Sequence, residues 1–570
     1  MRHRRPTAVL IPVVLLALGA PFRPGAVPLA GQDAGDDMVQ GVPEAVRHIQ
    51  AQEFERAVEI LEEVTAREPE NARAWSLLGV SLHSLGALDR AIAAHTRAAE
   101  FDQTRPTALF NLGLTYALKG DPDRAFRSLQ EAEATGRVDM TRLDLDPDAE
   151  SLRNDPRYAA LLPSEAELAD PFVEEVEVLH EWRGEHAGDQ FGWIARDAGD
   201  VDGDGIHDVT TSAPTWGENA GKVYLFSGRT GETLWTREGE PEWQLGLGIE
   251  SAGDVNADGV PDVVAGAPFG DRALVFHGRT GEVLLEIEAP QPGEFFARKA
   301  GDAGDVDGDG HDDLLLGGSR NDEAGEDTGR MYLFSGRDGS LLHAWTGEEP
   351  GDQFGAAGAG TTWARGGLYA IGAPNAGPSD RGRVYVYDGL TDEPAFVIEA
   401  DESGAFLGQM FVSIVGDVDG DGVPDVYGSD WADGALGRTT GRIYVHSGAD
   451  GRRLLALGGE AAGDGFGIGT ADAGDLDGDG HDDLVVGAWQ QGSVAPSGGK
   501  VYVYSGRDGT LLFSITGKVP GETFGFDATG VGDVDGDGTP DLLLTSAWSS
   551  VHGARTGRMF VVSGRAPRPR

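Results

Sequence analysis

Two different hydrophobic patterns divide the 570-residue chain. Residues 38–162 carry apolar positions at helical spacing, and the arrangement repeats after 34 residues. Residues 172–565 instead contain short apolar or alternating runs, separated by glycine-rich turns, which predict β-strands. The chain is therefore expected to be a multidomain protein in which an α-solenoid precedes an all-β domain.

The helical region contains two clear units and a weaker one before them. The corresponding positions are Trp75, Leu78, Gly79, Gly86, Ala91 and Ala98 in one clear unit and Leu109, Leu112, Gly113, Gly120, Ala125 and Ala132 in the next. Small residues suit places where paired helices approach closely, and the pattern resembles the tetratricopeptide repeat. That resemblance implies a groove for a peptide or partner protein, with a spacer or dimerisation element as the alternative. Residues 146–162 are expected to cap the stack.

A second repeat is an acidic loop, Asp-x-Asp/Asn-x-Asp-Gly-x-x-Asp, which occurs six times. Its first, third, fifth and ninth positions carry side-chain oxygens, and its seventh is expected to offer a main-chain carbonyl. These positions are Asp200, Asp202, Asp204, Ile206 and Asp208; Asp254, Asn256, Asp258, Val260 and Asp262; Asp305, Asp307, Asp309, His311 and Asp313; Asp417, Asp419, Asp421, Val423 and Asp425; Asp475, Asp477, Asp479, His481 and Asp483; and Asp533, Asp535, Asp537, Thr539 and Asp541.

This spacing predicts calcium binding. Alternate residues of a curled loop turn toward one centre, the glycine permits the bend, and Ca²⁺ takes six to eight oxygens. An EF-hand would place a Glu at position 12 between helices, whereas here position 9 leads directly into an apolar strand. We therefore expect about six Ca²⁺ sites in β-hairpin loops. Because His311 and His481 occupy the position that offers its backbone, they are not expected to bind metal through their rings.

The loops mark seven structural units. Their starts are 51–58 residues apart, except for one gap of 112 residues that accommodates a fourth unit without a loop. Each unit has sequence for about four strands, and four-stranded units repeated radially form a β-propeller. The seventh unit lacks its last strand, while an additional strand at about residues 173–182 precedes the first unit. We expect this N-terminal strand to complete the seventh blade.

The units resemble the FG-GAP repeat of the integrin alpha-chain head. The resemblance rests on Phe191-Gly192 with Ala213-Pro214, Gly266-Ala267-Pro268, Phe354-Gly355 with Gly372-Ala373-Pro374, Phe466-Gly467 with Gly487-Ala488-Trp489, and Phe524-Gly525 with Ser546-Ala547-Trp548. Phe295-Phe296 and Gly317-Gly318-Ser319 depart from the pattern. The family implies a seven-bladed propeller with calcium loops on one face and ligand-binding loops on the other. The chain lacks the later domains of an integrin.

Four tryptophans are candidates for partner binding. They lie at or just after the Gly-Ala-Pro position and are Trp216, Trp431, Trp489 and Trp548. An exposed ring of indoles can stack on sugars or grip a partner's side chains. The alternative is that the four indoles pack between blades.

The net charge and the amino-acid composition exclude some functions, and the N-terminal sequence predicts where the protein is located. The chain has 95 acidic and 45 basic residues, a net charge of −50, which excludes nucleic acid as a main partner. Without cysteine it has no disulfide, thiolate metal site or thiol nucleophile. A basic start and an apolar run at residues 8–20 predict an export signal. An uncleaved anchor is the alternative, and no later stretch is long enough to span a membrane.

The expected organisation is a signal peptide at 1–30, a linker at 31–37, helical repeats at 38–162, a linker at 163–171, a propeller at 172–565 and a tail at 566–570. We interpret the chain as an exported, secreted, periplasmic or cell-surface protein for adhesion or scaffolding. The propeller would bind an extracellular protein or glycan and the groove a second protein. No catalytic residue or organic cofactor is assigned. An enzyme acting on polysaccharide or lipid, and an envelope component with purely structural calcium, are the alternatives.

Overall fold

The computed structural model describes residues 41–362 and 367–570. The predicted signal peptide and first linker lie outside these residues, as does the start of the helical region. The chain divides between Ala169 and Asp170 into a helical unit and a strand-rich unit. Each unit is described by itself below.

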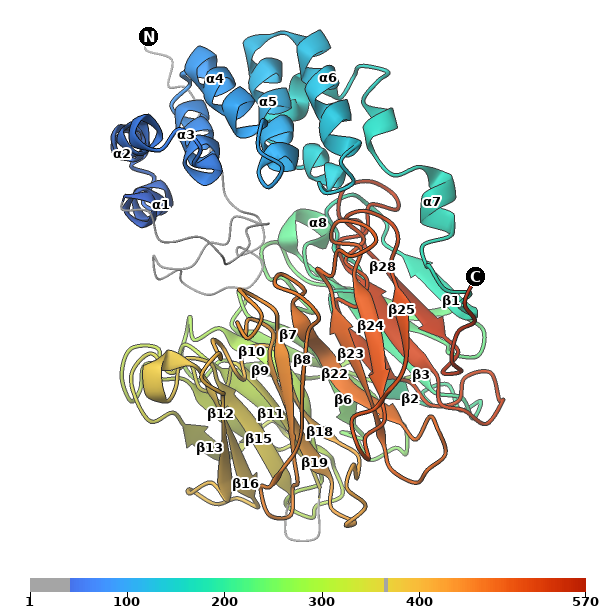
Figure 1. Cartoon of the computed structure of the whole chain (residues 1–570). Coiled ribbons are helices and arrows are strands. Elements are labelled where there is room, and N and C mark those ends of the chain that lie inside the picture. The colour runs from blue at the N-terminus through green and yellow to red at the C-terminus, as the bar shows by residue number, and fades with distance from the viewer. Residues whose placement is uncertain (1–40, 363–366) are drawn as a thin grey trace. The chain divides into compact units, whose positions relative to one another are not determined.

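The helical unit is built from three consecutive helix pairs, shown in blue to cyan in Figure 1. The six helices are α1 (Val42–Gln50), α2 (Phe54–Arg67), α3 (Ala72–Ser84), α4 (Leu88–Ala98), α5 (Arg105–Lys119) and α6 (Pro122–Glu133). The glycines occupy the tightest contacts within pairs. A Cβ on Gly79 would lie 2.4 Å from Nδ1 of His95, and one on Gly113 would lie 2.6 Å from Cγ of Leu129. The repeat thus requires small residues where the paired helices approach closely.

The tail of the helical unit consists of short turns rather than a regular helix. Its elements are η2 (Met140–Asp144), η3 (Pro147–Leu152), η4 (Ala159–Leu161) and α7 (Glu165–Ala169). Asp139 and Asp146 each accept a hydrogen bond from the main-chain N–H two residues later, at 2.9 Å. Such side-chain caps favour short turns over a continuous helix. The tail packs on α5, where Phe110 and Leu114 share its core.

The strand-rich unit is a propeller of seven four-stranded antiparallel sheets among the described residues. Blades 1 to 4 comprise β2 (Ala195–Gly199), β3 (Asp208–Ala213), β4 (Lys222–Phe226) and β5 (Thr233–Glu238); β6 (Gly248–Gly253), β7 (Asp262–Ala267), β8 (Arg272–Phe276) and β9 (Val283–Glu288); β10 (Phe296–Gly304), β11 (Asp313–Gly318), β12 (Arg330–Phe334) and β13 (Leu341–Thr346); and β14 (Ala357–Thr361), β15 (Leu368–Ala373), β16 (Arg383–Asp388) and β17 (Phe396–Glu399).

Blades 5 to 7 continue the same order. They comprise β18 (Val412–Val415), β19 (Asp425–Asp430), β20 (Arg442–His446) and β21 (Arg453–Gly458); β22 (Phe466–Gly474), β23 (Asp483–Ala488), β24 (Lys500–Tyr504) and β25 (Leu511–Thr516); and β26 (Ala528–Gly530), β27 (Leu542–Ser546), β28 (Arg558–Val562) and β1 (Val178–Arg183). Two short turns, α8 (Trp216–Asn219) and η5 (Pro378–Asp380), lie between second and third strands.

The blades form a closed ring. Their first strands contact one another in the order β2, β6, β10, β14, β18, β22 and β26, and β26 contacts β2 again. These first strands therefore surround the propeller axis. In the seventh blade β1 pairs with β28, so that His180 lies opposite Val561 and Trp182 opposite Met559. The outer strand of this blade thus comes from the N-terminal side of the propeller.

The Phe-Gly pair has a steric basis. Phe354 is buried, and Gly355 has a φ of +85°, where a Cβ would lie 2.2 Å from the carbonyl oxygen of Arg330. In the third blade Phe296 is the buried aromatic residue, and Ala297 takes a positive φ of +58°. The departure at Phe295-Phe296 therefore keeps the backbone conformation of the motif with alanine in place of glycine.

Candidate functional site

The six acidic loops join the first strand of a blade to its second strand. All six lie at one end of the propeller, which we name the loop end, because all first strands run in the same sense around the axis. Connections between second and third strands lie at the other end, which we name the opposite end. The fourth blade has no acidic loop between β14 and β15, in agreement with the sequence, and residues 363–366 lie outside the described residues.

The first aspartate of each loop organises the backbone around its own carboxylate. Oδ1 of Asp200 accepts hydrogen bonds from the N–H groups of Gly203 and Asp204 at 2.8 and 3.0 Å, and Oδ2 accepts one from Gly205 at 2.9 Å. The same three bonds recur around Asp305, Asp417, Asp475 and Asp533. The glycine at position 6 takes a positive φ, for example +88° at Gly205, and so completes the bend.

The ninth aspartate links the loop to the rest of its blade. Oδ1 accepts an N–H from the glycine that follows the third strand of the same blade, at 2.8–3.1 Å in all six blades with a loop. In five blades Oδ2 also accepts the N–H of the second loop residue at 2.8–2.9 Å. These aspartates are Asp208, Asp262, Asp313, Asp425, Asp483 and Asp541, and each is fully buried.

Burial raises the pKa of these ninth-position carboxyls. The pKa of Asp208, Asp262 and Asp541 rises to about 6 and that of Asp425 to about 7, with loss of hydration as the main cause. The pKa of Asp313 and Asp483 is raised for the same reason. A cation held beside a buried carboxylate favours its ionised form. The loops are thus electrostatically suited to a bound cation.

Five loops bring carboxylate oxygens together closely enough to hold a metal ion. In each of them three carboxylates place one oxygen within 4.8 Å of the others. The sets are Asp200, Asp202 and Asp208; Asp305, Asp307 and Asp313; Asp417, Asp419 and Asp425; Asp475, Asp477 and Asp483; and Asp533, Asp535 and Asp537. An all-oxygen donor set fits Ca²⁺ or Mg²⁺ better than a softer transition metal.

The second loop differs because it contains Asn256. Both polar atoms of the Asn256 amide are buried without a hydrogen-bond partner, and so is Oδ2 of Asp262. Buried polar groups are normally paired. A cation between them would use both side-chain oxygens, so this loop also fits a metal ion, although it is outside the five carboxylate sets.

The segment that follows the third strand of each blade with an acidic loop also lies at the loop end, and it contributes a basic side chain that the sequence did not lead us to expect. In the first blade, Arg229 donates from Nε to Oδ2 of Asp204 at 2.8 Å and from Nη2 to its carbonyl oxygen at 2.8 Å. Equivalent ion pairs to the fifth-position aspartate join Arg337 to Asp309, Arg507 to Asp479 and Arg565 to Asp537. The recurring Ser-Gly-Arg sequence was the available signal for these four arginines. In the two other blades, His277 lies 3.1 Å from Asp258, and Arg452 pairs with the third-position Asp419.

Seventh-position residues engage the loop through their backbone and neighbouring blades through their side chains. Their N–H groups donate to the fifth-position carboxylate at 2.8–3.1 Å in all six loops, which are residues Ile206, Val260, His311, Val423, His481 and Thr539. Nδ1 of His311 contacts the carbonyl oxygen of Val255 at 2.7 Å, and Nδ1 of His481 contacts that of Val418 at 2.9 Å. These two imidazoles therefore bridge adjacent loops.

The four candidate tryptophans do not share one environment. Trp489 and Trp548 are 5% and 8% exposed, and their rings pack on each other at 4.8 Å and on Phe526. Trp216 and Trp431 are half-buried, and their indole N–H groups donate to Glu185 and Gln409. The expectation of an exposed ring of four indoles is not met at Trp489 and Trp548, because both fill the interior beside the seventh blade.

The tail of the helical unit covers part of the predicted groove. Nε2 of His83 on α3 lies 2.8 Å from Oδ2 of Asp148 in η3, and its Nδ1 lies 2.8 Å from Oγ1 of Thr115 on α5. The guanidinium of Arg142 stacks on Phe110 at 5.2 Å. The tail therefore occupies the surface of α5 next to α3 and acts as more than an end cap.

Comparison with protein families finds matches in both units. A tetratricopeptide-repeat model matches residues 43–106. An FG-GAP repeat model matches residues 197–226 and 249–285, and an FG-GAP-like repeat model matches residues 475–544. The matched segments include the first two helix pairs and the acidic loops of blades 1, 2, 6 and 7.

Integrin alpha chains are among the similar curated proteins. Integrin alpha-PS5 of Drosophila melanogaster is 31% identical over 182 residues, which cover 28% of this chain and 18% of that protein. Integrin alpha pat-2 of Caenorhabditis briggsae is 30% identical over 284 residues, covering 44% of this chain and 18% of that protein. The chain thus spans less than a fifth of the length of these relatives. None of the described helices has the length and apolar character needed to cross a membrane.

Proposed function

Because tetratricopeptide repeats here precede an FG-GAP propeller similar to that of integrin alpha chains, we propose that this chain is an exported recognition protein whose propeller binds calcium. The propeller binds an extracellular protein or glycan, and the helical unit binds a second protein. The observation that carries this proposal is the set of six similarly built acidic loops at one end of a propeller of a recognition-type family.

Calcium supplies positive charge that holds carboxylates of each loop around one centre. The chain's own residues prepare that arrangement, because the first aspartate curls the backbone and the ninth fastens it to the third-to-fourth-strand turn. Adjacent loops are also connected. Oδ2 of Asp312 accepts the N–H of Asp254 at 2.6 Å, and Oδ2 of Asp482 accepts that of Asp417 at 3.0 Å. Ordering one loop therefore supports its neighbour.

The opposite end of the propeller is the proposed recognition surface. Its second-to-third-strand connections carry three exposed apolar side chains, Phe269, Leu436 and Val494, which are 51%, 62% and 53% exposed. Leu436 and Val494 belong to the neighbouring blades 5 and 6. Exposed apolar residues on neighbouring loops are suited to contact with a partner.

The helical unit offers a smaller surface than an open repeat array. Since the tail covers α5 next to α3, the surface left for a second protein belongs to α1 and α3. Protein binding is a common use of such repeats, because stacked helix pairs present an extended face. Removing the hydrogen bond between His83 and Asp148 is expected to expose more of this surface.

Affinity capture tests the proposal. The full chain is immobilised and exposed to medium and envelope extract from the source cells, first in millimolar calcium and then in chelator, with proteins and glycans identified. We expect a defined partner that is retained in calcium and released by chelator. The double variant Leu436→Ser/Val494→Ser should lose it, whereas Leu341→Ser/Leu511→Ser, with similarly exposed leucines near the loop end, should retain it. Absence of any calcium-dependent partner would contradict the proposal.

A further inference from the structure

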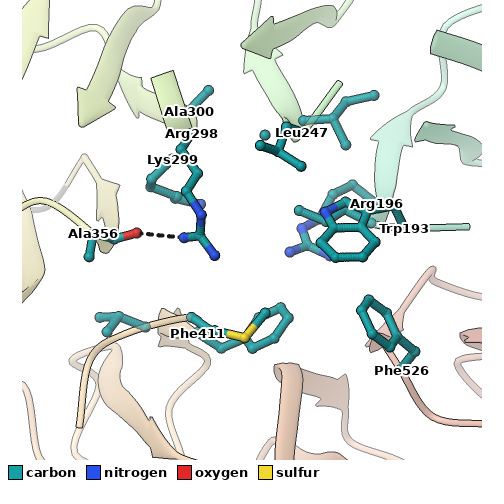
Figure 2. Close-up of a pocket in the computed structure, with 14 residues that line it drawn as sticks. Trp193, Arg196, Leu247, Arg298, Lys299, Ala300, Ala356, Phe411 and Phe526 are labelled. Atoms are coloured by element: carbon teal, nitrogen blue, oxygen red, sulfur yellow. Dashed lines mark hydrogen bonds between the residues drawn. The ribbon is translucent and has the colours of Figure 1, made fainter. Parts of the chain in front are cut away.

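A cavity lies on the propeller axis where the first strands begin, at the opposite end from the metal loops. The hollow is open to solvent, and its volume, including that open space, is about 550 Å³. Figure 2 shows side chains from several blades converging on it. None of its lining residues belongs to an acidic loop, because the first strands that line it run from this end of the propeller toward the loop end.

The cavity carries more positive than negative charge, although the whole chain has a net charge of −50. Arg196 forms ion pairs with Asp527 at 2.5 Å and with Glu250 at 2.9 Å. Lys299 reaches the same Glu250 at 3.3 Å. Arg196 and Lys299 are therefore paired with these two carboxylates. The third cation of the cavity, Arg298, forms no ion pair with either of them.

Arg298 has no carboxylate partner among the described residues. Its one hydrogen bond runs from Nη1 to the carbonyl oxygen of Ala356 at 3.2 Å, drawn as the dashed line in Figure 2. Besides burial, the positive charge of Arg320 also lowers the pKa of Arg298. Burial lowers the pKa of Arg298 to about 10, so the guanidinium is still charged at neutral pH. The Arg298 side chain is half-buried at the edge of this open hollow, so its guanidinium is only partly hydrated and can pair with an anion that enters.

The remaining walls are apolar. Trp193 and Phe526 pack together with a ring separation of 4.9 Å, and Phe411 and Leu247 complete the lining beside Met410. Figure 2 shows the Arg298 guanidinium facing this space, with Trp193 and Arg196 across from it. A few convergent polar groups in a mostly apolar hollow are typical of small-molecule sites.

We propose that this axial cavity binds a small organic carboxylate, which pairs with Arg298 and lays its apolar body against Trp193, Phe411 and Phe526. A planar guanidinium with free N–H groups matches a carboxylate in a two-point arrangement. One uncompensated positive charge suits a monoanion better than a phosphate, which carries more charge. The site goes beyond partner recognition by the propeller and does not depend on it.

Titration calorimetry of the full chain in calcium tests this site with phenylacetate as the probe. We expect saturable one-to-one binding in the millimolar range or tighter. Phenylacetamide, which has the same shape without the charge, should bind at least about tenfold more weakly. Inorganic phosphate should also bind more weakly than phenylacetate.

Variants locate the binding. Arg298→Gln should weaken phenylacetate binding at least about tenfold, and Arg298→Lys should give an intermediate affinity because it keeps the charge but loses the fork. Arg438→Gln removes an exposed arginine at the same end and should change nothing. Without ligand, Arg298→Gln should melt no lower than the unmodified chain, since it removes an unpaired cation.

Three results would overturn the proposal. They are no saturable phenylacetate binding at millimolar concentrations, equal binding of phenylacetamide, and unchanged binding by a folded Arg298→Gln variant. A failure of calcium-dependent capture with intact phenylacetate binding would leave this site standing and reject the recognition function alone.

Discussion

The helical unit and the propeller are both repeat structures, but they join their repeats differently. In the helical unit, Phe110, Phe126 and Leu129 lie in an apolar core that runs from the third helix pair into the tail. In the propeller, the apolar cores within and between blades are accompanied by acidic loops whose carboxylates crowd together. Dependence on a cation is therefore expected to be a property of one unit and not of the whole chain.

The two units also end differently. The main contacts of each helix pair are with its neighbours along the stack, and the tail packs on the last pair and reaches His83 of the second. The propeller has no last blade, because its first strands form a closed ring and β1 joins β28. A local change should stay local in the open stack, whereas in the ring it affects two neighbours at every position.

Removing calcium should produce the largest difference in stability between the two units. At a site affinity near 10⁻⁴ M, millimolar calcium contributes about 1.4 kcal/mol per site, or roughly 8 kcal/mol for six sites. We expect chelator to lower the melting temperature of the propeller by many degrees and to leave the helical unit unchanged. Differential scanning calorimetry of the full chain, with far-UV circular dichroism at the helix signal, measures both transitions.

Magnesium at the same concentration is the control for ionic strength and charge. Magnesium should restore only part of the lost melting temperature of the propeller, because Mg²⁺ prefers fewer protein ligands and more water. If chelator shifts neither transition, or shifts both equally, the proposed division between the units is wrong.

Much of this division could be predicted from the sequence. Seven units, the loop missing from the fourth and the helix pairs follow from regular spacing, because a repeated core position identifies itself by its period. The tetratricopeptide and FG-GAP resemblances are confirmed by the family matches and the fold. The predicted N-terminal strand was placed at residues 173–182, and the strand that pairs with β28 is Val178–Arg183.

Other features depend on contacts between residues that are distant in sequence. The pairing of Arg229 with Asp204 needs the third-to-fourth-strand turn to return to the loop of the same blade. The axial cavity needs side chains from several blades, so no local pattern marks Arg298. The tail was predicted as an end cap, but its contact with His83 becomes visible only when α3 and α5 lie side by side.

Acid should act on the helical unit through a single buried histidine. His95 is fully buried without a hydrogen-bond partner, and burial lowers its pKa to about 3. Because the folded pKa lies below the unfolded value, its contribution to stability is complete above pH 6.5 and is lost as the pH falls toward 3. The loss is about 3 kcal/mol at pH 4.5.

Urea unfolding of the helical unit, followed by far-UV circular dichroism, measures this loss of stability between pH 7.5 and 4.5. His95→Leu should remove this part of the pH dependence, since leucine fills a similar volume and has no charge to bury. Equal pH slopes for the variant and the unmodified chain would show that His95 does not cause the loss.

The smallest expected effect concerns a single loop. Arg229→Gln removes a cation that is bound to a predicted calcium ligand, so the first loop should bind calcium about two- to fivefold more tightly. Arg337→Gln is the matched control, because Arg337 lies 3.7 Å from Asp309 rather than 2.8 Å, and its effect should be smaller. Calcium titration of both variants distinguishes the cases, and weaker binding after Arg229→Gln would mean that the arginine positions the loop.

The strand that closes the ring, β1, also determines when the seventh blade can form during synthesis. Glu181 in β1 and Arg558 in β28 form an ion pair although they are 377 positions apart. At about 5–20 residues per second, a ribosome needs about 20–75 seconds to make the chain between them. During that interval β1 has left the ribosome without its partner, and six blades can fold before the seventh exists. The ring is therefore completed only after β28 has been made, and β1 needs protection from other strands until then.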